Sequence, residues 1–159
     1  CMYMDLELLE WLNTVTFPEE ARYSDLNYAE KAYSIFADDL KKSATTRASI
    51  FGTLHVDATE LLMDLMEKTG LKAFIGKINM DRNGSKALQE ESAVVSATDT
   101  VRWLNDIAGK YENVKPILTP RFTPSCHDFC FDICVILFQV KNFVKVHKST
   151  PFVLCSYLH

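Results

Sequence analysis

Short apolar runs alternate with longer amphipathic segments along the first three-quarters of this chain, and this alternation limits the folds that it can adopt. Amphipathic helices are expected at 25–42, about 57–70 and about 98–111, and strands at 48–54, 72–78 and 114–119. Strands that alternate with helices are typical of a parallel sheet whose strands are joined by crossover helices. The sequence therefore predicts an α/β fold.

Signals for helix ends support this division. Asp57 is the expected N-cap of the second helix, and Glu60 supplies the carboxylate of a capping box. Gly70 is placed to end the same helix, where a left-handed residue is favoured. A short helix is expected at 4–12, whereas residues 14–23 are expected to form a connector, in which Pro18 fits a turn or the first turn of a helix.

Polar and aromatic side chains follow each expected strand. Parallel sheets bind ligands beyond the carboxyl ends of their strands, so these side chains are expected to share one edge of the sheet. In chain order they are His55, Asn79, Asp81, Arg82, Arg121 and Phe122. Each of them also fits a structural role as a helix cap, a hydrogen bond that braces a loop, or a surface charge.

The stretch 114–126 combines a short apolar strand with a loop that is stiffened by Pro120 and Pro124. Between the two prolines lie Arg121, with a planar fork of donors, and Phe122, with an aromatic face. Together they suit a flat heteroaromatic ligand. The alternative is an arginine that pairs with a carboxylate on a neighbouring helix and a phenylalanine that fills the core.

Composition excludes several classes of partner. The net charge of −4 and the lack of a Lys/Arg-rich run argue against nucleic acid. The longest apolar run, 133–138, is too short to cross a membrane, and no signal segment opens the chain. A cytoplasmic protein is expected. Because the chain starts at Cys1 without an initiator Met, we expect a piece of a longer protein.

The motifs of hydrolytic chemistry are missing from the sequence. It has no His-x-His pair, no His-Glu-x-x-His, no Cys-x-x-Cys, no Gly-x-Ser-x-Gly and no Gly-rich phosphate loop. Cys126, Cys130 and Cys134 with His147 are an alternative metal site, but their spacing is unlike that of structural zinc sites. We therefore expect a binding half without its catalytic half, with no catalytic residue and no metal ligand.

Residues from about 4 to 126 resemble the guanine deaminase family of zinc-dependent enzymes in the amidohydrolase superfamily. The matching stretches that look most specific to this family are 75–83 and 115–126. The other matching stretches are 4–12, 16–20, 45–48 and 52–55.

The resemblance implies a partial TIM barrel, with about strands two to four of a (β/α)8 fold of the metal-dependent amidohydrolase type. It implies hydrolytic deamination of guanine to xanthine and ammonia, with zinc as the cofactor of the full-length family. Guanine or a related purine is the implied partner, with Arg121 and Phe122 as substrate-binding residues. A homo-oligomer is also compatible with the resemblance.

The departures from the family concern catalysis. The family's His-x-His zinc motif lies upstream of the stretch at 4–12, and its other zinc ligands and proton-shuttling Glu lie on later strands. We predict a partial amidohydrolase barrel at 1–126 and an unrelated or out-of-frame tail at 127–159. The expectation is a guanine deaminase fragment that binds no zinc and is inactive alone. The alternatives are a non-catalytic purine-binding module and a non-functional truncated product.

Overall fold

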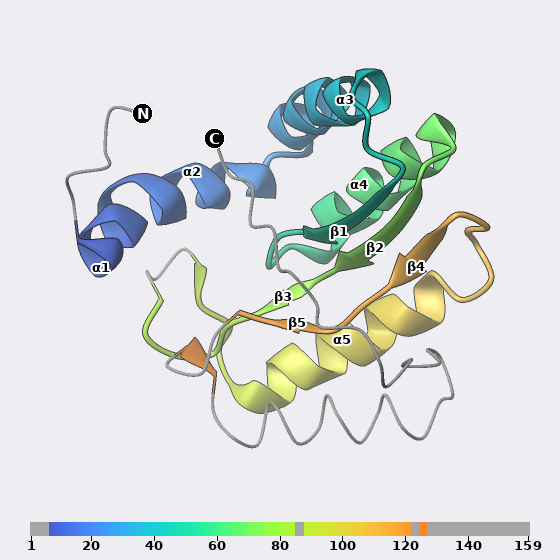
Figure 1. Cartoon of the computed structure of the whole chain (residues 1–159). Coiled ribbons are helices and arrows are strands. Elements are labelled where there is room, and N and C mark those ends of the chain that lie inside the picture. The colour runs from blue at the N-terminus through green and yellow to red at the C-terminus, as the bar shows by residue number, and fades with distance from the viewer. Residues whose placement is uncertain (1–6, 85–87, 122–124, 127–159) are drawn as a thin grey trace, which may run out of the picture.

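A computed structural model describes residues 7–84, 88–121 and 125–126 of the chain. Its strands are β1 (Arg47–Phe51), β2 (Lys72–Gly76), β3 (Ile78–Asn79), β4 (Val114–Pro116) and β5 (Thr119–Pro120). The first, second and fourth form a parallel sheet in the order β1-β2-β4, and β3 pairs with β5, also in parallel. Figure 1 shows β3 continuing from β2, and β5 from β4. The predicted α/β fold with a parallel sheet is confirmed.

Two of the expected strands are interrupted. The runs 72–78 and 114–119 each divide into a longer and a shorter strand. At the break, a Cβ atom on Gly76 would collide with the side chain of Thr119 and the carbonyl oxygen of Ile117. This close approach requires a residue without a side chain at position 76, so it explains why glycine stands there.

Crossover helices join the strands. They are α4 (Val56–Thr69), between β1 and β2, and α5 (Ala93–Asp106), between β3 and β4, while α3 (Leu26–Lys42) precedes β1. The side chain of Asp25 caps α3 by accepting a hydrogen bond of 2.9 Å from the backbone N–H of Asn27. Gly70 ends α4 with φ of 75°, as predicted.

Two expected helix starts are wrong. Helix α4 begins at Val56, so its N-cap position belongs to His55 rather than Asp57, and no side chain caps it there. Helix α5 begins five residues before the expected Thr98. The hydroxyl of Ser92 accepts a hydrogen bond of 3.2 Å from the N–H of Val95 and fixes this earlier start.

One core lies between the larger sheet and the helices α3, α4 and α5. Side chains from all of these elements contribute to it, which is what crossover helices on a parallel sheet require. Its largest buried members include Tyr33, Leu62, Met63, Met66, Ile75 and Trp103. None of the helices in the described ranges has the length and hydropathy needed to cross a membrane.

Residues 14–23 are helical, so the prediction of a connector is wrong. The N-terminal region consists of α1 (Leu8–Trp11), a π-helix η1 (Leu12–Thr16), α2 (Phe17–Ala21) and a 3₁₀-helix η2 (Arg22–Ser24). Proline at position 18 lies in the first turn of α2, where proline is tolerated. Figure 1 shows these helices, in blue, on the side toward which β3 and β5 run.

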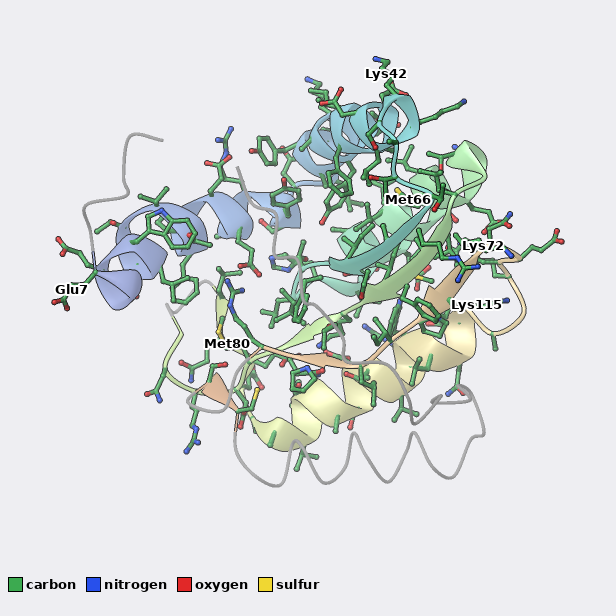
Figure 2. All side chains as sticks on the ribbon, in the orientation of Figure 1. Glu7, Lys42, Met66, Lys72, Met80 and Lys115 are labelled. Atoms are coloured by element: carbon green, nitrogen blue, oxygen red, sulfur yellow. The ribbon has the colours of Figure 1, made fainter. Side chains whose placement is uncertain are left out.

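A second, smaller core fixes these N-terminal helices. The ring of Phe17 is buried with Ile78, Met80 and Leu88, which lie in β3 and the segment that follows it. Figure 2 labels Met80 on this side of the molecule, while Lys72 and Lys115 lie at the opposite side. Helix α2 therefore packs beside the carboxyl ends of the strands, where ligands of parallel sheets bind.

Candidate functional site

Arg121 directly follows β5, at the carboxyl end of the smaller sheet. Its backbone N–H donates a hydrogen bond of 3.2 Å to the carbonyl oxygen of Asn79, the last residue of β3. The sheet pairing thereby continues as far as position 121, and the side chain of Arg121 starts from a fixed backbone.

The segment that begins at Arg121 is also held by hydrogen bonds at its other end, at Ser125 and Cys126. The carbonyl oxygen of Ser125 accepts hydrogen bonds from the backbone N–H groups of Asp81 and Arg82, at 3.0 and 3.2 Å. The thiol of Cys126 is buried and donates to the carbonyl oxygen of Asn79 at 3.1 Å. Both ends of the segment 121–126 are thus tied to the chain at the end of β3. Phe122, the second predicted substrate-binding residue, lies outside the described residues.

The side chain of Arg121 meets helix α2. Nη1 forms an ion pair with Oε2 of Glu20, and the guanidinium carbon lies 5.0 Å from the centre of the Phe17 ring. This ion pair is the alternative that the sequence left open for Arg121, a pairing with a carboxylate on a neighbouring helix. The pairing engages one edge of the guanidinium group, and within the described residues Nε and Nη2 have no hydrogen-bond partner.

Glu20 is almost completely buried, with 3% of its side chain exposed. Burial raises the pKa of its carboxyl group, and the charge of Arg121 opposes this shift only in part. Its second oxygen, Oε1, has no hydrogen-bond partner within the described part of the chain. Sequence reasoning missed Glu20 as a site residue, although it belongs to Thr-Phe-Pro-Glu-Glu at 16–20, one of the stretches that match the family.

His55 lies at the carboxyl end of β1, as predicted, where its backbone N–H donates to the hydroxyl oxygen of Thr53 at 2.8 Å. Burial, together with the positive charge of Lys77, lowers the pKa of its imidazole. Nε2 is buried, and no hydrogen-bond partner for it exists among the described residues. The lowered pKa favours the neutral imidazole at this edge of the sheet.

Asn79 fastens the sheet to a helix. Its side-chain amide donates hydrogen bonds to the hydroxyl oxygens of Ser96 at 2.7 Å and Thr100 at 2.8 Å, both in α5. The side chain is completely buried. The side chain of Asn79 therefore makes structural hydrogen bonds, which was the alternative to a binding role. It stabilises the end of β3, to which the backbone of Arg121 is hydrogen-bonded.

The described residues do not fit a zinc ion. In ranges 7–84, 88–121 and 125–126, no three His, Cys, Asp or Glu side chains lie close enough together to bind a metal. Cys126 belongs to these residues, whereas Cys130, Cys134 and His147 of the alternative metal site lie outside them. No hydrolytic step can be derived from the described part of the chain.

No family model matches the chain. The crystal structure of guanine deaminase from C. acetobutylicum with guanine bound in its active site superimposes with a TM-score of 0.83 and 42% sequence identity. That match covers 88% of this chain and 33% of the other.

This chain is homologous to guanine deaminases. The guanine deaminase of Mus musculus is 38% identical over 145 residues, which cover 91% of this chain and 31% of the mouse protein. The guanine deaminase of Homo sapiens is 40% identical over 126 residues, or 79% of this chain and 28% of the human one. The recognition of the family from its motifs is confirmed.

The chain spans about a third of the length of the guanine deaminases that it matches. The match to the mouse guanine deaminase covers 91% of this chain, so it extends past Cys126, where the recognised resemblance ends. The division at residue 126 stays a prediction, because residues 127–159 lie outside the described ranges.

Proposed function

We propose that this chain is the part of a guanine deaminase that contributes purine-binding groups, with Arg121 and Phe122 as the substrate-binding residues. In this proposal the chain forms about strands two to four of a (β/α)8 barrel. The complete barrel would deaminate guanine to xanthine and ammonia. The homology to guanine deaminases supports the reaction class, and the structural match to a guanine-bound guanine deaminase supports the fold.

One observation carries the assignment of the binding residue. The guanidinium group of Arg121 stands at the carboxyl end of parallel strands, with its backbone paired to β3 and with Nε and Nη2 not engaged by the described residues. The acceptors O6 and N7 on one edge of guanine match two donors of an arginine. A ring in the place of Phe122 would pack against the flat face of the base.

The zinc of the family would be held by residues other than those described, since these do not form a metal site. We therefore propose that the 159-residue chain alone neither retains a catalytic zinc ion nor deaminates guanine. Ammonia release from guanine by the purified chain, dependent on added zinc, would contradict this part of the proposal. The expected cytoplasmic location and homo-oligomer belong to the same proposal.

Equilibrium dialysis of labelled guanine against the full chain tests the binding role. Saturable binding is expected, and Arg121→Ala is expected to weaken it by about 5-fold to 150-fold, the range for a bidentate arginine–guanine contact. Arg22→Ala is the matched control, because Arg22 is an exposed arginine of the same region that pairs with Glu19. An affinity that Arg121→Ala leaves unchanged would contradict the assignment.

A further inference from the structure

The ion pair between Arg121 and Glu20 joins residues that are 101 positions apart in the sequence. Only 12% of the Arg121 side chain and 3% of the Glu20 side chain are exposed. Removing both charges from water costs free energy that their attraction does not reliably return. A gain in stability is therefore a weak explanation for this buried ion pair. Its geometry instead fits a role in fixing the orientation of the Arg121 side chain.

Three contacts restrict Arg121. The backbone N–H is held by Asn79, Nη1 is held by Glu20, and the guanidinium carbon stands over the ring of Phe17 at 5.0 Å. This distance is within the range of cation–π attraction. The contacts leave a rigid fork with Nε and Nη2 not engaged by the described residues. A fork that is fixed before binding loses less conformational entropy when a ligand arrives.

We infer that Glu20 is the positioning residue that orients Arg121 for the purine. The inference rests on the proposed binding role of Arg121 and extends it to a residue of helix α2. Glu20 acts through Arg121, because its Oε2 pairs with Nη1 of that residue, while its Oε1 is buried.

Helix α2 has the means to hold Glu20 in place. Phe17, one turn earlier in the same helix, is buried against Ile78 and Met80, and this contact anchors the helix beside the end of β3. The neighbouring Glu19 has a different environment, because it is half-exposed and bonds to Arg22 and Tyr28 on the surface. The two adjacent glutamates therefore provide a test residue and a matched control.

Guanine dialysis against the full chain and its variants tests the inference. Glu20→Ala is expected to weaken binding by no more than Arg121→Ala does, about 5-fold to 150-fold, because Glu20 acts through that arginine. Glu20→Gln keeps an oxygen that can accept from Nη1 and is expected to lose less, which guards against a fold defect of the alanine variant. Glu19→Ala is expected to bind as the wild type does. Each variant is assayed at a temperature where its denaturation curve shows it folded.

A double-mutant cycle separates positioning from general stability. In the Arg121→Ala background, Glu20→Ala is expected to cause no further loss of affinity, because the group that Glu20 orients is gone. An undiminished loss in that background would overturn the inference, and so would wild-type affinity in the Glu20→Ala single variant. Failure of the wild-type chain to bind guanine would overturn the proposed function itself, and the inference with it.

Discussion

Nζ of Lys77 lies 2.5 Å from Oε1 of Glu90, and only 1% and 6% of the two side chains are exposed. Nζ also donates to the carbonyl oxygen of Ile78 at 3.1 Å, while Oε2 of Glu90 accepts from the backbone N–H of Met80 at 3.0 Å. This buried pair ties the segment before α5 to β3. It therefore supports the strand end on which Arg121 is aligned.

Loss of Glu90 is expected to destabilise the fold strongly. Glu90→Ala leaves the ammonium group of Lys77 buried without an anion, which is expected to lower the free energy of unfolding by about 3–5 kcal/mol. Urea denaturation measures this change. Glu91→Ala is the control, because Glu91 is exposed and its loss is expected to cost less than about 0.5 kcal/mol. Equal stabilities of the two variants would show that the pair has no structural role.

A side chain at position 76 is expected to disturb the junction between the two sheets. Gly76→Ala would push a methyl group into Thr119 and the carbonyl oxygen of Ile117, at a cost of about 1–3 kcal/mol from overpacking. Gly109 has φ of 75° and open space around it, so Gly109→Asn is a control for backbone strain without a collision, with a residue that adopts this backbone more readily than most. Thermal unfolding of both variants measures the difference. An unchanged midpoint for Gly76→Ala would refute the close approach.

The stability of the fold is expected to fall in mild acid, partly through His55. Its folded-state pKa lies below the ordinary value of 6.5, because burial and Lys77 disfavour the charged imidazole. Neutral His55 thus contributes stability above that value, and the contribution is lost as the pH falls through the folded-state pKa. Unfolding free energies from about pH 8 to about pH 5 should decline less for His55→Gln than for the wild type. Parallel curves would contradict this.

Guanine binding is expected to weaken in acid because of Glu20. Burial raises the pKa of Glu20 above its ordinary value of 4.5, so it gains a proton at a higher pH than an exposed glutamate does. As the pH falls through this raised pKa, Arg121 loses its anionic partner and affinity should decline. Because the folded-state pKa of Glu20 is raised, its protonation stabilises the folded state, and this contribution is fully present below pH 4.5. Acid unfolding through Glu20 therefore does not explain the expected decline in affinity. Glu20→Gln should show a flatter binding profile across this range.

Local signals predicted much of the fold. Helix α3 begins after Asp25 and helix α4 ends at Gly70, as helix-capping preferences predict. Such caps can be predicted because they depend on neighbours in the sequence. The start of α5 was not predicted. Its first turn, after the Ser92 cap, contains the exposed β-branched residues Val94 and Val95, which do not follow the apolar spacing of an amphipathic helix.

Distant contacts account for what the sequence could not predict. Residues 14–23 are helical because Phe17 is buried against β3 and the segment after it, which no local pattern reveals. Glu20 meets Arg121 across 101 positions, so its place at the site follows from the fold alone. The sequence predicted the position of Arg121 at a strand end, since that depends on the order of strands and helices. The role of Phe122 stays a prediction.

The most direct test of the purine site is the NMR spectrum of the arginine side-chain guanidinium groups in the full chain, recorded with and without guanine. The signal of Arg121 can be identified by its loss in Arg121→Lys. We predict that guanine shifts this signal and leaves those of the exposed Arg22 and Arg102 in place. An unshifted Arg121 signal at saturating guanine, or equal shifts of all three arginines, would contradict the central claim that Arg121 holds the base.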